Sequence, residues 1–402
     1  MNAVEIKKDI HWIGAVDWDR RNFHGYSLSP KGTTYNAFLI KDQKNTIVDT
    51  VAAECAGQFL CNASQVTDLS NIAYIVVNHV EPDHSGALPR LVAACKPEKI
   101  ICSVMGEKAL KEYYDTEGWP LHAVKSGDSI SIGSRTLHFL ETRMLHWPDS
   151  MMTYVAEDKL LISSDAFGQN YATAERFADQ VDQAELFKEA ARYYANIVLP
   201  FSSVTLKILD AVKSMKLDID MIAPDHGLIW RGGLVSRILS DYRQYAIQKP
   251  ANKAVVFFDT MWRSTEQMAH AVAEGLFQAG TPVAVMSLKS NHHSDVMEEV
   301  FHSGAVLAGS ATHNNGVLPS VAAMIAYMKG LKPQNKVAAA FGSYGWSGEA
   351  LKDVSDALAA MHCQVIEGVR ARNKPTHDQL KACVELGRTV SLALQDKIAA
   401  WS

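Results

Sequence analysis

Seven histidine and carboxylate side chains stand out because each of them follows a short apolar run. Four lie within the six residues His79-Val-Glu-Pro-Asp-His84, directly after the run Tyr74–Val77. The other three, His146, Asp165 and His226, follow further apolar runs. A single polar residue at a strand end is common. Seven residues of metal-ligating types in this arrangement predict a metal centre at one edge of a β layer.

The types of ligand indicate which metal the site prefers. Imidazole-rich sites suit zinc, whereas carboxylate oxygens favour iron or manganese and stabilise higher oxidation states. If Glu81, Asp83 and Asp165 all bind, their negative charges offset most of the charge of two ferrous ions. Such a site can change its oxidation state at modest electrostatic cost. Zinc also accepts carboxylates, so a dizinc hydrolase remains the alternative.

The backbone of the six-residue motif is expected to form a loop. Asn78 and Pro82 disfavour a helix, and a loop at a strand end can direct alternate side chains to one point. Neighbouring residues on an extended chain point in opposite directions. Asp83 and His84 can therefore both bind metal only if the chain turns sharply. His84 is either a ligand or a residue that contacts the ligands or swings out of the site.

A second set of residues, in the C-terminal part of the chain, predicts a site for a phosphate and a flat ring. The stretch Phe258–Thr265 connects an apolar strand to a helix expected from Glu266. Its hydroxyls and the N–H groups of the helix start can bind an anion, although a simple helix cap is the alternative. The loops Gly309–Gly316 and Gly342–Gly348 follow two further strands. Such strand ends are where doubly wound folds bind ligands.

The same loops carry glycines, which let a ring approach, and aromatic side chains, which can stack on it. No G-x-G-x-x-G motif opens the first turn, so FMN is expected rather than a dinucleotide. The residues predicted to contact it are Thr260, Met261, Trp262, Arg263, Ser264, Thr265, Ser310, Thr312, His313, Asn314, Asn315, Gly316, Ser343, Tyr344, Gly345, Trp346, Ser347 and Gly348.

The apolar pattern that positions these sites divides the chain into two domains. Up to about residue 248 the runs are short and often alternate, which indicates a mostly β layer with helices such as Gly106–Thr116 and Ala184–Ile197. Beyond the polar stretch Gln248–Asn252, strands alternate with helices, which predicts a parallel sheet covered on both faces. We expect domains at residues 1–249 and 250–402. The strands expected in the second are Ala254–Phe258, Val283–Leu288, Ala305–Ala308, Val337–Phe341 and Gln364–Ile366.

The composition excludes several classes of protein. Hydrophobic residues are 48% and charged residues 21% of the 402, which is ordinary for a globular chain. The net charge of −5 argues against nucleic acid as a partner. Apolar stretches such as Val321–Met328 are too short to span a membrane, and no signal peptide begins the chain, so a cytoplasmic location is expected. Six cysteines without a C-x-x-C pair provide no zinc ribbon and no iron site with four cysteine ligands.

The ligand pattern resembles that of the metallo-β-lactamase superfamily, whose first motif usually reads H-x-H-x-D-H. Here Glu81 replaces the second histidine, a departure that is the signature of the flavodiiron proteins. The second half fits that family too, since its first loop is similar to the flavodoxin phosphate loop T-x-T-G-N-T, with Arg263 and Ser264 departing from the Gly-Asn. The resemblance covers essentially the whole chain. It implies a mixed α/β and α+β architecture, in which a metallo-β-lactamase-like αββα sandwich precedes a flavodoxin-like doubly wound parallel sheet.

The resemblance also implies a diiron centre with FMN. One iron would be held by His79, Glu81 and His146, the other by Asp83, His84 and His226, with Asp165 as the bridging carboxylate. The activity implied is reduction of O2 to water, of NO to N2O, or of both, with electrons from a rubredoxin-like donor. A head-to-tail homodimer would bring the flavin of one chain to the irons of the other.

Three further residues have two interpretations each. His24 and Tyr26 either supply protons or polar contacts beside the irons, or they pack within their loop. Trp147 follows His146 directly and either faces the flavin of the partner chain or fills a buried packing position.

Overall fold

A computed structural model describes residues 2–401 of the chain. By their contacts these residues form two compact units. The first contains the N-terminal segment up to Gly25, Ser29–Tyr193 and Phe201–Ala246. The second contains Ile247 onward, and also two short segments from the N-terminal half, Tyr26–Leu28 and Tyr194–Pro200.

The first unit contains a mixed seven-stranded sheet in the order β1-β2-β7-β8-β9-β10-β11. The pairs β8–β9, β9–β10 and β10–β11 are parallel, and the pairs β1–β2, β2–β7 and β7–β8 are antiparallel. The strands are β1 Val4–Lys7, β2 Ile10–Trp12, β7 Phe38–Ile40, β8 Asn45–Val48, β9 Ile72–Val77, β10 Lys99–Ser103 and β11 Leu121–Val124.

A second sheet of six strands has the order β12-β13-β14-β15-β16-β17. All its pairs are antiparallel except β15–β16, which is parallel. The strands are β12 Ser129–Ser131, β13 Thr136–Glu141, β14 Met151–Val155, β15 Leu160–Ile162, β16 Met221–Ala223 and β17 Trp230–Arg231. Shorter strands in the N-terminal region are β3 Ala15–Asp17, β4 Asn22–Phe23, β5 Ser27–Leu28 and β6 Thr33–Tyr35.

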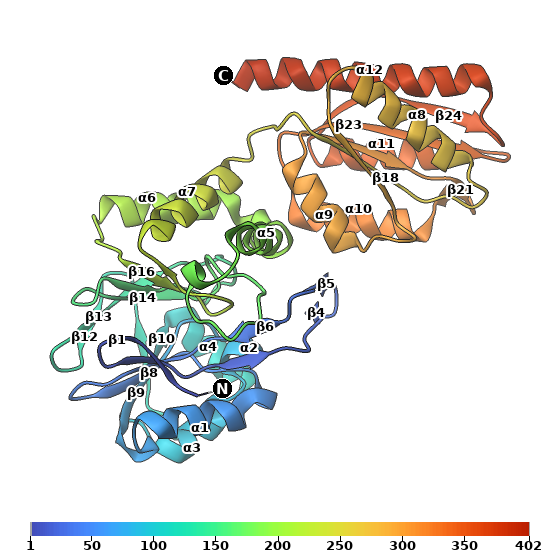
Figure 1. The fold of residues 1–402 in the computed structure, drawn as a ribbon. Coiled ribbons are helices and arrows are strands. Elements are labelled where there is room, and N and C mark those ends of the chain that lie inside the picture. Colours follow the sequence, from blue (N-terminus) through green and yellow to red (C-terminus); the bar gives the residue numbers. More distant parts are fainter. Residues whose placement is uncertain (1, 402) are drawn as a thin grey trace. The chain divides into compact units, whose positions relative to one another are not determined.

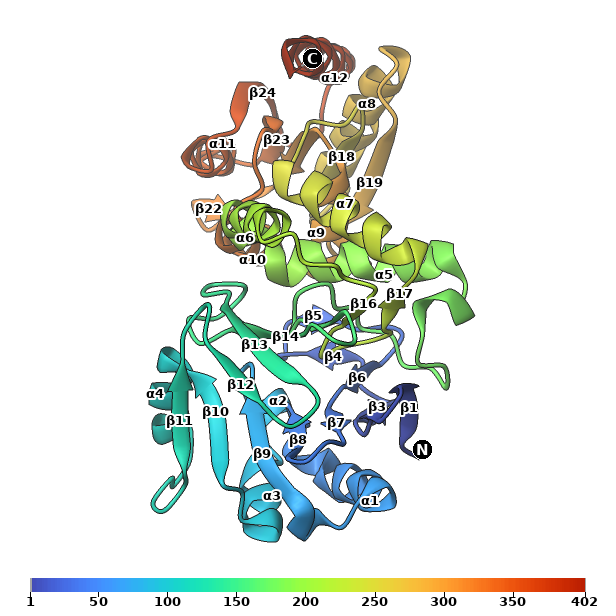
Figure 2. The same ribbon diagram turned by 90° about the vertical axis from the view of Figure 1, so that its left-hand side faces the viewer.

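The two sheets pack face to face, and helices cover their outer faces. Apolar side chains from both sheets, such as Phe38 and Ile162, form the core between them. Helices α1 Ala56–Val66, α3 Leu88–Cys95 and α4 Val104–Tyr113 pack on the outer face of the seven-stranded sheet. On the far side of the six-stranded sheet lie α5 Gln183–Tyr193, α6 Ser202–Ser214 and α7 Gly233–Ile247 (Figures 1 and 2). This is the predicted αββα sandwich.

The second unit is built on a parallel five-stranded sheet in the order β19-β18-β20-β23-β24. In chain order this is 2-1-3-4-5, the doubly wound arrangement that places ligands at the carboxyl ends of the strands. The strands are β18 Ala254–Phe258, β19 Val283–Ser287, β20 Ala305–Gly309, β23 Val337–Tyr344 and β24 Gln364–Arg372, with the small hairpin β21 Thr312–His313 and β22 Gly316–Val317. All five predicted strands are present.

Helices cover both faces of this sheet. Helices α8 Ser264–Gln278 and α12 His377–Trp401 share one face, with α9 His293–His302 and α10 Pro319–Leu331 on the other (Figure 1). Helix α11, Ala350–Ala360, connects β23 to β24. Helices α8 and α12 cross closely at two glycines: a Cβ on Gly275 would lie 1.9 Å from the carbonyl oxygen of Val384, and one on Gly387 2.2 Å from that of Val272. Only glycine fits at this crossing.

One predicted helix of the first unit is broken. The pattern predicts a helix over Ala184–Ile197, but α5 ends at Tyr193 and a π-helical turn, Tyr194–Val198, follows. A 3-10 turn at Leu199–Phe201 then leads into α6. Together these pieces form the one described segment, Gln183–Ser214, that is long and apolar enough to cross a bilayer. It is half buried, as the core helices of soluble proteins are, so it is weak evidence for a membrane protein.

The two short segments that join the second unit are held there by hydrogen bonds. The N–H of Leu28 donates to Oγ of Ser294 at 3.2 Å, and Nδ2 of Asn196 donates to the carbonyl of Ser294 at 3.3 Å. The phenol of Tyr327 donates to Oδ1 of Asn196 at 2.7 Å. Ser294 at the start of α9 therefore contacts both segments.

Candidate metal centre and ligand pocket

The fully buried strand β9 directs the first candidate ligand. Asn78 follows the strand, and the carboxylate of Asp49 accepts hydrogen bonds from its backbone N–H at 2.7 Å and from its side-chain amide at 2.8 Å. Oδ1 of Asn78 in turn accepts a hydrogen bond from Thr153 at 2.7 Å. These bonds hold the end of the strand, so the next residue, His79, has a defined direction.

The prediction that the whole six-residue motif is a loop is wrong at its C-terminal end. Glu81 is the N-cap of a one-turn helix, α2 Pro82–Ser85, which contains Asp83 and His84. Proline suits the first position of a helix because the N–H that it lacks would have no partner there. This turn is the sharp change of direction that lets two adjacent side chains reach the same site.

The remaining candidates come from the other sheet. His146 lies in the loop after β13, Asp165 three residues beyond β15, and His226 three residues beyond β16. The expectation that all seven candidates converge on the edge of one β layer is therefore wrong. The candidates come from strand ends of both sheets, and the face-to-face packing of the two sheets brings them together.

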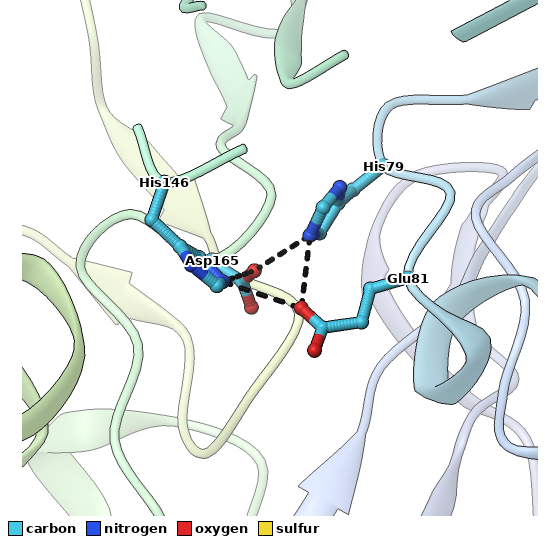
Figure 3. A group of neighbouring side chains, drawn as sticks. All are labelled: His79, Glu81, His146 and Asp165. Atoms are coloured by element: carbon cyan, nitrogen blue, oxygen red, sulfur yellow. Dashed lines mark hydrogen bonds and ion pairs between the residues drawn. The ribbon is translucent and has the colours of Figure 1, made fainter. Parts of the chain in front are cut away.

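One group of candidate ligands consists of His79, Glu81, His146 and Asp165, whose ligand atoms all lie within 4.8 Å of one another. Figure 3 shows the four side chains pointing toward a common centre. Oδ2 of Asp165 lies 3.0 Å from Nε2 of His146 and 3.4 Å from Nε2 of His79. Oε2 of Glu81 lies 3.2 Å from Nε2 of His79 and 3.4 Å from Nε2 of His146. Two imidazoles and two carboxylates therefore face one point.

A second group consists of Asp83, His84 and His226, again with all ligand atoms within 4.8 Å. Oδ2 of Asp83 lies 3.2 Å from Nε2 of His226 and 3.4 Å from Nε2 of His84. The other oxygen of Asp165, Oδ1, lies 3.2 Å from Nε2 of His84 and 3.5 Å from Nε2 of His226. Each oxygen of Asp165 thus faces one group, which is the placement expected of a bridging carboxylate. His84 points into its group.

Several atoms of these groups are buried without a hydrogen bond. They are both oxygens of Asp83, both nitrogens of His84 and Oδ2 of Asp165. Buried polar atoms almost always have a hydrogen-bond partner, and the contacts among these atoms in the described residues lack the geometry of hydrogen bonds. Carboxylate oxygens and imidazole nitrogens share one further type of partner, a metal cation. The residues therefore fit a pair of metal ions.

The electrostatics of the first group lead to the same conclusion. Burial raises the pKa of a carboxyl, but the imidazoles of His84 and His146 hold the pKa of Asp165 well below its usual range. Burial lowers the pKa of an imidazole, yet Asp165 and Glu81 raise the pKa of His146 to about 9. The carboxylates thus remain charged, and the site stabilises added positive charge, as protons or as metal ions.

Several residues outside the two groups contact them. Nδ1 of His79 donates to Oδ2 of Asp149 at 2.9 Å, and the phenol of Tyr193 donates to Oδ1 of Asp165 at 3.0 Å. The sequence interpretation missed both residues as contacts. Asp149 lies close to His146 in the sequence, three positions after it, but Tyr193 lies at the end of an amphipathic helix and has no sequence signal. The backbone carbonyl of Thr34 accepts a hydrogen bond from Nδ1 of His226, and His24 contacts Glu81.

His24 contacts the site, with Nε2 2.8 Å from Oε1 of Glu81. Tyr26 belongs to neither ligand group. Its ring packs against that of Tyr327, with 6.1 Å between the centroids, inside the second unit. Trp147 is partly buried and packs edge-on against His79, with 5.2 Å between the ring centroids.

The second unit has a pocket of about 840 Å³ at the carboxyl ends of its strands. Of the residues predicted to contact a cofactor, eleven line it: Met261, Trp262, Arg263, Ser264, Thr312, His313, Asn314, Ser343, Tyr344, Gly345 and Trp346. Four residues that the sequence interpretation missed also line it: Gln267, Ala311, Asn373 and Lys374. Asn373 and Lys374 follow β24, whose expected end was several residues too early.

The other predicted contacts lie outside the lining of this pocket. They are Thr260, Thr265, Ser310, Asn315, Gly316, Ser347 and Gly348. Two of these, Thr265 and Ser310, form hydrogen bonds with residues in or next to the pocket lining. Oγ1 of Thr265 lies 3.0 Å from Oγ of Ser343, and Oγ of Ser310 accepts the N–H of Leu318 at 3.0 Å and donates to the carbonyl of Ala311 at 2.8 Å.

The first loop of the pocket fits a phosphate and a ring. Arg263, which stands where the flavodoxin loop has glycine, has a φ of 67°, so this residue adopts the left-handed conformation that favours glycine. The hydroxyl of Thr260 is buried without a hydrogen bond among the described residues. Trp262 and Trp346 are 89% and 78% exposed, and such large exposed rings beside a pocket suit stacking on a planar ligand.

Comparisons with known proteins agree with both units. The family model described as "ODP family beta lactamase" matches residues 33–227, and the flavodoxin model matches residues 256–387. The chain is 47% identical to the rubredoxin-oxygen oxidoreductase of Megalodesulfovibrio gigas over the full length of both proteins. It is 43% identical to the nitric oxide reductase of Moorella thermoacetica, over 98% of this chain and 99% of that protein. The crystal structure of the flavodiiron protein from Giardia intestinalis superposes with a TM-score of 0.95 at 31% identity, over 100% and 98% of the two chains.

Proposed function

The chain belongs to the flavodiiron protein family, and we propose that it reduces O2 to water, NO to N2O, or both, with electrons that pass through FMN. The observation that carries this proposal is the carboxylate of Asp165, each of whose oxygens faces one of two ligand groups. A single carboxylate between two groups suits a pair of metal ions, and a pair of metal ions suits a small substrate that bridges both. The flavodoxin unit on the same chain supplies a site for the redox cofactor.

The family resemblance implies how the ligands are shared between the two irons. His79, Glu81 and His146 would hold one iron, and Asp83, His84 and His226 the other, with Asp165 between them. When bound, two ferrous ions and a reduced flavin together supply the four electrons that reduction of O2 to two waters takes. The chain's own contribution is to fix the ligands. His24, which is 2.8 Å from Glu81, can hold a proton at Nε2 beside the site.

The pocket of the second unit would hold FMN. Ser264 and the N-terminus of α8 would bind its phosphate. Trp262, Tyr344 or Trp346 would stack on its ring. The Megalodesulfovibrio gigas relative is named for rubredoxin, and we take a rubredoxin-like protein, in the cytoplasm, as the electron donor.

The proposal includes a head-to-tail homodimer. Electrons tunnel efficiently only over short distances, so the flavin must lie close to the irons that it reduces. In a dimer with a two-fold axis, the same contact between unlike domains occurs twice. Each flavin would then lie against the metal centre of the other chain. Trp147, packed on His79, is a candidate for that surface.

The decisive experiment is a cofactor count followed by a gas assay. The protein is purified without oxygen, and iron, zinc and flavin are measured per chain. We expect two irons and one FMN, with consumption of O2 or formation of N2O when a reduced rubredoxin is added. Zinc in place of iron, with hydrolytic activity and no flavin, would establish a dizinc hydrolase instead. Flavin without iron would indicate that the protein is an electron carrier.

A further inference from the structure

A buried carboxylate outside the ligand groups, that of Asp149, is hydrogen-bonded to an imidazole of the first group. Oδ2 of Asp149 accepts hydrogen bonds from Nδ1 of His79 at 2.9 Å and from the backbone N–H of Val80 at 2.7 Å. Asp149 is only 3% exposed, so solvent screens its charge weakly. Because the proton on Nδ1 of His79 is held in the hydrogen bond to this carboxylate, Nε2 keeps the lone pair that faces Glu81 and Asp165.

The second group also has a buried carboxylate nearby, that of Asp225, but no imidazole of the group donates a hydrogen bond to it. Nδ1 of His226 donates to the backbone carbonyl of Thr34 at 2.7 Å, which is an uncharged acceptor. Nδ1 of His84 is 3.8 Å from Oδ2 of Asp225, which is too far for a hydrogen bond. His79 of the first group is therefore oriented by a hydrogen bond to a carboxylate, and His226 of the second group by one to a peptide group.

We propose that Asp149 is a positioning residue that makes the two metal positions electronically unequal, so that the position beside His79 binds its metal more tightly and has the lower reduction potential. A carboxylate that accepts from the outer nitrogen of a ligating imidazole raises the basicity of the inner nitrogen. Extra negative charge also stabilises the ferric state more than the ferrous state. The two irons are therefore oxidised in a fixed order, with the ion beside His79 first. This inference rests on the proposed diiron function.

The first test is metal binding by the full-length protein in its metal-free form. Asp149→Asn keeps the size of the side chain and an oxygen that can accept from Val80, but removes the charge. In a titration with Co(II) followed by absorbance, we expect the wild-type protein to bind two ions. In the variant, one of the two affinities falls by about 10- to 100-fold, the usual effect of losing such a partner, and the other does not change.

The second test is a redox titration of the iron-loaded protein followed by electron paramagnetic resonance. The mixed-valent state of the wild-type protein is expected over a wide range of potential, because the two irons differ. In Asp149→Asn the lower potential rises toward the higher one and that range narrows. A tenfold loss of the preference for the ferric ion corresponds to about 59 mV.

Ser103→Ala is the matched control. Oγ of Ser103 donates to the backbone carbonyl of Asp149 at 2.7 Å and caps α4 by accepting from Gly106 at 2.9 Å. Its loss loosens the same loop and leaves the carboxylate charge in place. We expect a lower melting temperature with both Co(II) affinities and both potentials unchanged. An equal change of affinity and potential in Ser103→Ala would overturn the proposal, because Asp149 would then act only by holding its loop.

The remaining outcomes separate this inference from the proposed function. A wild-type chain that binds no pair of metal ions overturns the function itself. Two bound ions whose affinities do not respond to Asp149→Asn overturn only the role of Asp149. If that variant does not fold, proton resonance spectra of Co(II)-loaded wild-type protein decide the question. The Nδ1 proton of His79 should then exchange with solvent more slowly than that of His226, and equal exchange would contradict the proposal.

Discussion

The phenol of Tyr193 donates a 3.0 Å hydrogen bond to Oδ1 of Asp165, and both side chains are buried. Burial and the charge of Asp165 raise the pKa of Tyr193 well above its ordinary value. The phenol therefore stays protonated and remains a donor. Oδ2 of Asp165, by contrast, has no hydrogen bond among the described residues. The two oxygens of the central carboxylate thus differ in their surroundings.

Tyr193→Phe should destabilise the metal-free protein. The change removes a donor from a buried charged acceptor, which costs on the order of 1–3 kcal/mol. Urea unfolding with and without the substitution measures the difference. Tyr113→Phe, at a position where the side chain is 47% exposed, is the control and should change little. Equal unfolding free energies for wild type and Tyr193→Phe would show that the hydrogen bond contributes nothing to stability.

Glu81→His should shift the metal content from iron toward zinc. The substitution replaces a carboxylate that faces both His79 and His146 with an imidazole, and imidazole-rich sites suit zinc. Metal analysis of protein grown with both metals gives the ratio, and the exposed Glu112→His is the control. If iron content and gas reduction both persist unaltered, the carboxylate does not select the metal.

Thr260→Ala combined with Ser264→Ala should deplete flavin and leave iron unchanged. Each hydroxyl lost from a charged phosphate costs about 1.5–3 kcal/mol of binding. Ser264 lines the pocket and Thr260 does not, so the single Ser264→Ala should account for most of the loss. The flavin-to-protein absorbance ratio after purification is the readout, and the exposed Thr376→Ala is the control. Full flavin retention in the double variant would move the phosphate site elsewhere.

A mixture of two inactive variants should recover activity if the flavin of one chain serves the irons of the other. One variant is His79→Ala, which disrupts the metal centre, and the other carries the two flavin-loop substitutions. Subunit exchange gives mixed dimers in which one intact metal centre faces one intact flavin. The gas assay before and after exchange measures the recovery. No activity despite exchange confirmed by mass spectrometry would mean that electrons pass within one chain.

The metal-free protein should lose stability as the pH rises from about 6.5 to about 9. The pKa of His146 is raised from 6.5 to about 9 by Asp165 and Glu81 against the effect of burial. A raised folded-state pKa stabilises the fold fully below the unfolded value and no longer does so above the folded value. At about 1.4 kcal/mol per pH unit, the loss is at most about 3 kcal/mol.

Urea unfolding at several pH values measures this decline. The metal-free His146→Gln variant should not show this decline, because it lacks the titrating imidazole. The metal-loaded protein should also show a flatter profile, because a bound ion replaces the proton on Nε2. A metal-free wild type whose unfolding free energy is constant over this range would contradict the assignment.

The sequence was sufficient to predict the five strands of the second unit and the candidate ligands, since both follow from local patterns. His79, His146, Asp165 and His226 each follow an apolar run that is visible in the sequence. Contacts that only the tertiary fold creates could not be predicted in this way. Tyr193 reaches Asp165 from an amphipathic helix on the far side of the six-stranded sheet. The convergence of two sheets was missed for the same reason, because periodicity does not show which strands share a sheet.

Two predictions about local structure were wrong because of features of the nearby sequence. Pro82 was taken as a reason against a helix, although it stands at the one helical position that tolerates proline. The strand β24 continues to Arg372 through alternating polar residues, so its end, and with it Asn373 and Lys374 in the pocket, could not be located from the apolar run alone.

Two segments of the N-terminal half, Tyr26–Leu28 and Tyr194–Pro200, pack in the second unit. This limits where the chain can be cut to obtain one unit alone. His24, which contacts Glu81, and Tyr193, which contacts Asp165, each stand at most two residues from a segment that packs in the other unit. A fragment ending near residue 249 would keep these segments without the surface on which they fold. A cut near residue 249 therefore does not separate the two units, because two segments of the second unit stay on the N-terminal fragment. Recombination that exchanges the flavodoxin half among relatives must also carry over the residues that match these two segments.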